Sequence, residues 1–191
     1  MEKVLIGNGG HAREVMAQMG VKLERFVDDQ YIDAETSPLS KFDPNKHIAM
    51  IAIANSKDRF DMLQKLPKNT QFFTFIHPTA LVMNNIEIGE GSFIGAYSIL
   101  TTNIKIGSHA ILNRGNHIGH DCKIGSFFSA MPGVIVSGNV TIYDMVYMGT
   151  NSSIREKLSV HSLTTIGMNS AVVKHIEKPG IYVGCPAKII K

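Results

Sequence analysis

The sequence predicts a small α/β domain followed by a parallel β-helix. Two observations favour this fold class. An apolar residue recurs at every sixth position from Ile76 to Val172 without a break, and the residues before this stretch alternate short apolar strands with helical segments. A period of six fits neither an α-helix nor an ordinary strand. We therefore expect an α/β domain over residues 1–75, hexapeptide coils over 76–174 and a C-terminal cap over 175–191.

The first domain is expected to hold four short strands and two helices. The strands are predicted at residues 3–6, 25–27, 47–54 and 72–76, and the helices at 11–19 and 56–66, the second with Ser56 as its N-cap. Strands that alternate with helices imply a small parallel sheet. Its size is about half that of a full dinucleotide-binding domain, so the fold is expected to be half-Rossmann-like.

The turn Gly7-Asn8-Gly9-Gly10-His11-Ala12 after the first strand fits the G-x-G-x-x-G/A pattern. Such a turn exposes backbone N–H groups at the start of a helix, which favours a phosphate. Asp28 follows about twenty residues later, where an acidic side chain can bind a ribose. Glycines that only permit a tight turn are the simpler explanation. If the turn binds a ligand, a mononucleotide or nucleotide-sugar diphosphate fits the half-size domain better than NAD does.

In a hexapeptide β-helix three hexads form one triangular coil, so residues 76–174 give about five coils. Side chains at the sixth position and two residues before it are expected to point inward. The residues two positions before each sixth-position residue are mostly small or apolar. They include Ser92, Ser98, Ala110, Cys122, Val134, Val140, Val146 and Ser152. Both ends of the prism expose sheet edges that need a cover. We expect the α/β domain to cover the first end and the tail 174–191 to cover the second.

Composition excludes several classes of partner. The formal net charge is +3, from 19 Lys and Arg against 16 Asp and Glu, which is too small to indicate nucleic acid or an anionic membrane. Cys122 and Cys185 do not make a disulfide framework and favour a reducing compartment. We see neither an export signal nor an apolar run long enough to span a bilayer, so we expect a cytoplasmic protein without membrane insertion.

Polar residues gather in the segment Asn113-x-x-x-His117-x-x-His120-Asp121. His117, His120 and Asp121 all fall on outward positions of the hexad. A histidine beside an acid can act as a general base near neutral pH. Adjacent strand residues diverge, so Asp121 can orient His120 only if the corner turns it back. Ordinary surface histidines are the alternative, and this is what we expect of His109, His161 and His175.

Several motifs together resemble one family. They are the G-x-G-G-H turn, Asp28-Asp29, Ile53-Ala54-Asn55, Ile118-Gly119-His120-Asp121-Cys122, Ser137-Gly138-Asn139-Val140 and the closing Val183-Gly184-Cys185-Pro186-Ala187-Lys188. They resemble the left-handed β-helix sugar O-/N-acyltransferases of the NeuD/PglD type, which act on sialic acids or on UDP-4-amino sugars. The resemblance covers nearly the whole chain and implies a left-handed parallel β-helix.

The resemblance also implies a homotrimer, with active sites in the subunit clefts and acetyl-CoA as co-substrate along the outside of the coils. No metal is expected. His120 matches the general base, Asp121 its orienting acid, Asn113 a residue near the acceptor, and the Gly138 N–H the oxyanion donor. The nucleotide-sugar pocket is matched by Gly9, Gly10, His11, Asp28, Asp29 and Asn55, and the CoA site by Gly138, Thr150, Gly167 and Met168. In one departure, Ser129 stands where the family often has a second histidine near the thioester.

Four functions stay open at this stage. We favour N-acetylation of a nucleotide-linked 4-amino-6-deoxysugar of the UDP, dTDP or GDP type, because Asp28-Asp29 and the phosphate turn together suit a nucleoside diphosphate. O-acetylation of a sialic acid is the main alternative. A carbonic-anhydrase-like zinc site at His117 and His120 has poor geometry for one metal, because the two histidines straddle a corner. The last alternative is a scaffold without enzymatic activity, on which these histidines have no role.

Overall fold

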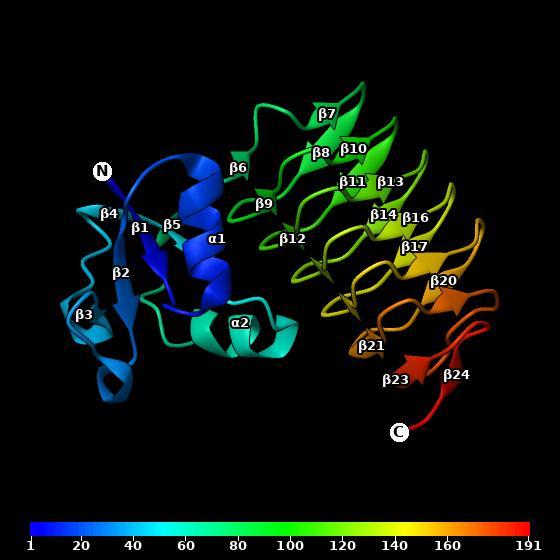
Figure 1. Ribbon diagram of the computed structural model, residues 1–191. Coiled ribbons are helices and arrows are strands. Elements are labelled where there is room, and N and C mark those ends of the chain that lie inside the picture. Colours follow the sequence, from blue (N-terminus) through cyan, green and yellow to red (C-terminus); the bar gives the residue numbers. More distant parts are fainter.

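The computed structural model describes residues 1–191 as a three-sided prism with a small α/β domain at its side (Figure 1). The domain has a five-stranded parallel sheet in the order β3-β2-β1-β4-β5. Its elements are β1 (Glu2–Ile6), α1 (Gly10–Met19), β2 (Glu24–Val27), β3 (Ser37–Pro38), β4 (His47–Ile51), α2 (Ser56–Leu63) and β5 (Gln71–Phe72), with two 3₁₀ turns at Asp29–Tyr31 and Leu39–Lys41.

The predicted strands and helices of this domain are present, with two corrections. The N-cap of α2 is Asn55 rather than Ser56, since the Asn55 side chain accepts a hydrogen bond from the Asp58 N–H at 3.0 Å. The strand predicted at residues 72–76 is two strands, because the chain leaves the domain sheet after Phe72 and enters the prism at Phe75.

Three parallel sheets form the prism, and each coil is 18 residues long, since Ile99 pairs with Leu81 above and with His117 below. The domain-facing sheet has β6 (Phe75–Ile76), β9 (Phe93–Ile94), β12 (Ile111–Leu112), β15 (Ser129–Ala130), β18 (Tyr147–Met148), β21 (Thr164–Ile166), β23 (Gly180–Val183) and the antiparallel β24 (Lys188–Ile189). The second sheet has β7 (Leu81–Val82), β10 (Ile99–Leu100), β13 (His117–Ile118), β16 (Ile135–Val136), β19 (Ser153–Ile154) and β22 (Ala171–Val172). The third sheet has β8 (Ile86–Ile88), β11 (Ile104–Ile106), β14 (Lys123–Ile124), β17 (Thr141–Ile142) and β20 (Ser159–Val160).

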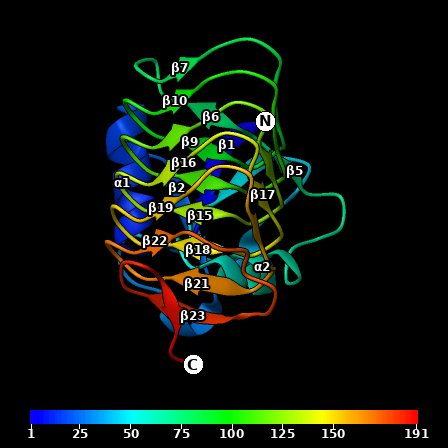
Figure 2. The ribbon, with the colours of Figure 1, turned by 90° about the vertical axis from the view of Figure 1, so that its right-hand side faces the viewer.

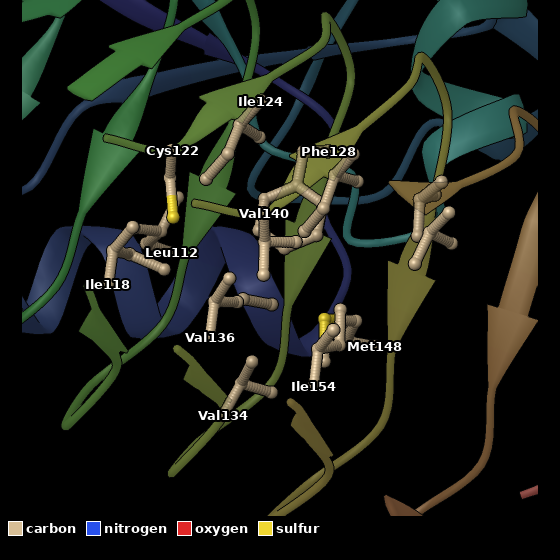
Figure 3. Close-up of a cluster of buried hydrophobic side chains, with 14 of the residues drawn as sticks. Leu112, Ile118, Cys122, Ile124, Phe128, Val134, Val136, Val140, Met148 and Ile154 are labelled. Atoms are coloured by element: carbon tan, nitrogen blue, oxygen red, sulfur yellow. The ribbon is translucent and has the colours of Figure 1, made fainter. Parts of the chain in front are cut away.

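Apolar side chains fill the prism from end to end, as the six-residue period predicts. A cluster of 23 buried residues includes sixth-position residues such as Leu112 and Ile118 and the small residues Cys122 and Val134 two positions earlier (Figure 3). The sixth-position residues of the first coil are exceptions, since Ile76 is 42% exposed. Burial of the repeated aliphatic residues therefore stabilises the coils from the second one onward.

The prediction that the α/β domain covers the first end of the prism is wrong. The domain lies against the side, where α1 and α2 face the domain-facing sheet (Figures 1 and 2). Ala12 and Val15 of α1 share a buried cluster with Phe93 and Ile111 of that sheet. At the first end Leu81 stays 52% exposed. The tail does pack on the other end, where Ile176 is 5% exposed and joins the core of the prism.

A fully buried arginine of α2 joins the domain to the prism. Arg59 Nε donates to the His109 carbonyl at 2.8 Å, and its Nη2 donates to the Phe127 and Phe128 carbonyls and to Ser129 Oγ at 2.9–3.0 Å. Its Nη1 donates to carbonyls that directly precede α2. Burial lowers the pKa of Arg59 to about 9. Since one guanidinium satisfies carbonyls of both parts, it holds the domain in a fixed position on the prism.

Ser129 belongs to the same junction, which corrects the expectation that it lies near a thioester. It is fully buried on β15, where its Oγ donates to the Ala54 carbonyl at 2.7 Å and accepts from Ser56 Oγ at 2.9 Å. Residue 129 is an outward position on the domain-facing sheet, and this position lies under α2. The absence of a histidine at residue 129 therefore has a structural explanation.

Candidate functional site

A cavity of about 800 Å³ opens at the carboxyl ends of β1, β2 and β4. Strand β1 lies between β2 and β4, so the direction of chain progression reverses next to it, which is where open α/β sheets bind ligands. The cavity is lined by Gly7, Asn8, Gly9, Gly10, His11, Val27, Asp28, Gln30, Tyr31, Ala52, Ile53, Ala54, Asp58, Asp61, Met62 and Lys65. Four of the residues predicted for the nucleotide-sugar pocket are therefore on its wall, namely Gly9, Gly10, His11 and Asp28.

The glycine turn leaves the start of α1 open for a ligand. Gly9 is the N-cap of α1, and no side chain caps the first N–H groups of the helix. A Cβ added at Gly9 would meet no atom within 4 Å, so the space beside the turn is free. Asn8 is held in place by Arg25, which donates to its Oδ1, and by Asp33, whose Oδ2 accepts from its Nδ2 at 2.6 Å. The contacts of Asn8 thus fix the turn, and the space beside Gly9 is free for a ligand such as a phosphate.

His11 lines the cavity as a neutral ring. It is only 9% exposed, its ring stands edge-on to Phe93, and neither ring nitrogen has a hydrogen-bond partner in the protein. Burial, with Arg59 as a second cause, lowers the pKa of His11 to about 4. His11 Nδ1 lies 3.8 Å from Glu14 Oε2, beyond hydrogen-bond distance. A buried polar group without a hydrogen bond is costly, so a ligand group that reached either nitrogen would bind favourably.

Two of the predicted pocket residues lie outside the cavity wall. Asp29 Oδ1 accepts from the Ser40 N–H at 3.3 Å, and the Asn55 side chain caps α2. The sequence analysis missed Lys65, whose Nζ lies 2.7 Å from Asp28 Oδ2 at the cavity. The two residues are 37 positions apart, so no local motif could have linked them. The cavity wall thus holds a carboxylate paired with an ammonium group, and it also includes the carboxylate of Asp58.

The second candidate region is the edge between the second and third sheets, which we call the His120 edge. Asp121 adopts a left-handed conformation with a φ of 60°, and this turns its side chain back toward its neighbour. Asp121 Oδ2 lies 2.7 Å from His120 Nδ1, so the question that the sequence left open is answered. The hydrogen bonds from His120 and then from Asn103 hold the pKa of Asp121 below its usual range. Both side chains are exposed to solvent.

Gly138 stacks on His120 one coil further along the same edge. A Cβ at Gly138 would lie 2.5 Å from His120 Nε2, so only glycine leaves the ring this close to the backbone. The Gly138 N–H donates to no acceptor within the protein. When His120 Nδ1 carries the hydrogen toward Asp121, Nε2 presents its lone pair on this side. The edge thus places a proton acceptor beside an unpaired N–H donor.

The remaining predicted residues lie on a different edge of the prism. Asn113, Thr150, Gly167 and Met168 follow strands of the domain-facing sheet, at the edge toward the second sheet, which we call the Asn113 edge. Asn113 is 3% exposed, and its Nδ2 donates to Glu14 Oε2 of α1 at 3.0 Å. One protomer therefore does not bring these residues to His120.

His109 corrects the expectation of a surface histidine. It is 3% exposed and stacks on Phe127 with ring centroids 5.1 Å apart, while Phe72 meets its ring edge-on. Burial, followed by the charge of Arg59, lowers the pKa of His109 to about 4. Its place beneath the α/β domain explains why an outward hexad position is buried.

Within one protomer no group of three or more His, Cys, Asp or Glu side chains converges as a metal site would require. None of the helices has the length and hydropathy needed to cross a membrane.

Known proteins resemble this chain over nearly its full length. A GDP-perosamine N-acetyltransferase from Escherichia coli O157:H7 is 26% identical over 170 residues, which span 80% of this chain and 77% of that protein. The acetyltransferase domain of PglB from Neisseria gonorrhoeae FA1090 has a TM-score of 0.87 with 25% identity over 98% of both chains. WeeI from Acinetobacter baumannii AYE has a TM-score of 0.88 with 28% identity over 100% of both chains.

A third solved structure, PerB from Caulobacter crescentus in complex with CoA and GDP-perosamine, has a TM-score of 0.88 over 100% of this chain and 98% of that chain. Its 23% identity supports the fold alone. No family model matches the chain.

The fold and these likenesses indicate the class of the protein, which is an acyltransferase with a left-handed β-helix. They confirm the resemblance predicted from the motifs and support a sugar acyltransferase of the hexapeptide-repeat type.

Proposed function

We propose that the protein transfers the acetyl group of acetyl-CoA to the amine of a nucleotide-linked 4-amino-6-deoxysugar. The observation that carries this proposal is the His120 edge, where the Asp121-bound imidazole and the unpaired Gly138 N–H lie side by side. The acetyl donor is supported by solved relatives in complex with CoA and with acetyl-CoA. The amino-sugar acceptor is supported by the name of the relative from Escherichia coli.

The chemistry needs no covalent enzyme intermediate. The amine nitrogen attacks the thioester carbon, and His120 Nε2 takes one proton from that nitrogen as the C–N bond forms. Asp121 at Nδ1 keeps the ring in the required tautomer and balances the charge of the imidazolium. The Gly138 N–H stabilises the oxyanion, a contribution of about 3 kcal/mol when the donor is preorganised. The C–S bond then breaks, and the proton passes to the CoA thiolate.

The nucleotide of the acceptor would lie in the cavity of the α/β domain. A diphosphate at the open start of α1 gains the unpaired N–H groups of the turn, and a neutral His11 nitrogen is within the same wall. Asp58 offers a carboxylate to the N–H donors of a nucleobase. GDP-perosamine is the first acceptor to test, because it is the substrate in the name of the curated relative.

We further propose that the active protein is a homotrimer. Three residues predicted to hold CoA, namely Thr150, Gly167 and Met168, lie on the Asn113 edge, whereas the general base and Gly138 lie on the His120 edge, so one protomer holds only half of the cleft. A trimer around an axis parallel to the prism would place one edge of each subunit against the other edge of its neighbour. We also propose a cytoplasmic location, which fits two free cysteines.

A thiol-release assay with acetyl-CoA tests the proposal. The acceptors are GDP-perosamine, UDP- and dTDP-linked 4-amino-6-deoxysugars, free sialic acid and CMP-sialic acid. We expect CoA release with one of the amino-sugar nucleotides and an acetyl group on nitrogen in the product, identified by NMR. Release with only a sialic acid would contradict N-acetylation, and release with none of the acceptors would favour a scaffold.

A further inference from the structure

The His120 edge contains a column of residues that recur every 18 positions. Asn85, Asn103, Asp121 and Asn139 lie at the tip of the corner in four successive coils, with φ values of 57°, 55°, 60° and 59°, and Lys157, with a φ of 61°, ends the column. Backbone hydrogen bonds stack these corners, because the Asn103 N–H donates to the Asn84 carbonyl and the Asp121 N–H donates to the Thr102 carbonyl. Their side chains therefore leave the prism one above the other.

A left-handed corner alone does not explain why the residues are Asn and Asp. These residues do tolerate positive φ better than most others. Yet the equivalent corner tips on the other two edges are mostly of other types, and they include Tyr97, His109, Phe127, Met145 and Leu163, all with φ between 56° and 60°. The fold thus accepts bulky side chains at these tips. The amides on the His120 edge need a further reason.

The side chains of this column form a directed chain of hydrogen bonds that ends at His120. Asn85 Nδ2 donates to Asn103 Oδ1 at 3.2 Å, and Asn103 Nδ2 donates to Asp121 Oδ1 at 3.1 Å. The other carboxylate oxygen, Asp121 Oδ2, is then the one that meets His120 Nδ1 at 2.7 Å. Asn103 thus occupies the oxygen that His120 does not use, which fixes the plane of the carboxylate.

We propose that Asn103 is a positioning residue of the acetyl transfer: it orients Asp121, and Asp121 in turn holds His120 with Nε2 toward Gly138. The proposal rests on the proposed function, because it presumes that His120 is the base. At metal sites the loss of a hydrogen bond to a ligand commonly costs about 10–100-fold in activity, and for the analogous bond to Asp121 we expect an effect at the low end of that range. An exposed carboxylate without such a partner rotates freely, so the imidazole spends less time in the reactive orientation.

Two substitutions at Asn103 separate positioning from folding. Asn103→Gly removes the amide at a φ of 55° that glycine adopts readily, so the corner keeps its shape. Asn103→Asp keeps the size but faces Asp121 with a second carboxylate, which repels it. Leu163→Gly is the matched control, because it removes an exposed side chain at the equivalent φ of 60° on the edge between the third and domain-facing sheets.

The first readout needs no substrate. The ring of His120 is followed by NMR in the full-length protein, with the signal assigned by its loss in His120→Gln. We expect the ring ¹⁵N shifts to show the proton on Nδ1 in the wild type and in Leu163→Gly. We expect a mixture of the two tautomers in Asn103→Gly, where Asp121 is held less firmly, and in Asn103→Asp, where the second carboxylate repels Asp121. A ring that keeps the wild-type tautomer in both Asn103 variants overturns the proposal, whatever the activity.

The second readout is steady-state kinetics with acetyl-CoA and the amino-sugar nucleotide that the wild type accepts. We expect kcat to fall about tenfold in Asn103→Gly, with KM for both substrates unchanged and a thermal midpoint equal to that of Leu163→Gly. Equal kcat in Asn103→Gly and Leu163→Gly overturns the proposal. Should the wild type acetylate no acceptor, the proposed function fails, while the ring tautomer still decides whether Asn103 positions His120.

Discussion

The cavity of the α/β domain and the His120 edge of the prism differ in how they treat a histidine. His11 in the cavity is buried, makes no hydrogen bond and has its pKa lowered to about 4 by burial, whereas His120 is exposed and lies within hydrogen-bond distance of a carboxylate. A ring held neutral by burial can bind a ligand through hydrogen bonds but is a poor base. A ring paired with an acid in solvent can accept a proton near neutral pH. The comparison supports the proposal that the cavity binds the nucleotide of the acceptor and that acetyl transfer takes place at the His120 edge.

The largest effect is expected at the edge. His120→Ala removes the proton acceptor, and general-base catalysis commonly contributes about 10²–10⁴-fold to a rate. We expect kcat to fall by that factor while calorimetry shows unchanged affinity for the nucleotide sugar. His117→Ala is the control, since this exposed side chain stands on β13 away from the corner. If His120→Ala lowered the affinity for the nucleotide sugar by the same factor as kcat, His120 would belong to the binding site, which would contradict the account.

The second largest effect is expected at the junction between the α/β domain and the prism, where Arg59 lies. Arg59→Met leaves the His109 and Phe127 carbonyls of the prism and the Ile53 carbonyl of the domain without donors, and unsatisfied buried acceptors cost about 1–3 kcal/mol each. We expect the free energy of unfolding in urea to fall by on the order of 3 kcal/mol or more. Lys57→Met, which breaks only the exposed pair with Asp61, should change it by less than about 1 kcal/mol. Equal losses would show that Arg59 does not join the parts.

The two buried histidines should make stability fall in acid. His11 and His109 have pKa values of about 4 in the folded protein and about 6.5 when unfolded, so between these values the unfolded chain binds more protons. Stability is therefore full above pH 6.5 and decreases as the pH falls toward 4, by up to about 3 kcal/mol for each ring. Urea unfolding at several pH values measures the slope.

His109→Phe provides the control for this slope. Phe127 occupies the equivalent corner of the next coil at a similar φ, so a phenyl ring fits the backbone there. We expect the pH dependence to flatten by about half in this variant, because one of two titrating rings is gone. An unchanged slope would mean that other groups cause the acid sensitivity.

The smallest expected effect lies in the cavity. Gly9→Ala adds a methyl group that contacts no protein atom, at a φ of −70° that alanine adopts without strain. The methyl occupies space beside the turn where a phosphate would approach, so KM for the nucleotide sugar should rise about tenfold with kcat and thermal stability unchanged. A similar change at Gly20, outside the cavity, is unsuitable as a control because its φ is 69°. Lys68→Ala, an exposed substitution away from the cavity wall, is the control and should leave KM unchanged.

The repeat made the prism predictable from sequence, since the hexad itself separates inward from outward positions. Leu112, Cys122 and Val134 are buried as that pattern predicts. It could not show which outward positions a second domain covers. His109 and Ser129 are outward by the hexad and buried in fact, because α2 and its Arg59 lie over them.

At the candidate site, local motifs named residues that lie close in sequence, and they could not name pairs that are distant in sequence. The motifs named the glycine turn that lines the cavity and the adjacent pair His120 and Asp121. They placed Asn55 in the pocket, although the start of α2 uses its side chain as a cap. They missed Asn103, because its link to Asp121 spans a whole coil of 18 residues. Contacts between coils follow from the register of the prism and become visible only once the coils are stacked.

The most direct test of the central claim compares kcat and KM of Gly9→Ala and His120→Ala in one assay of acetyl transfer to the accepted amino-sugar nucleotide. The account predicts that Gly9→Ala raises only KM, that His120→Ala lowers only kcat, and that the double variant shows both changes in full. A His120→Ala enzyme with the kcat of the wild type would contradict the account.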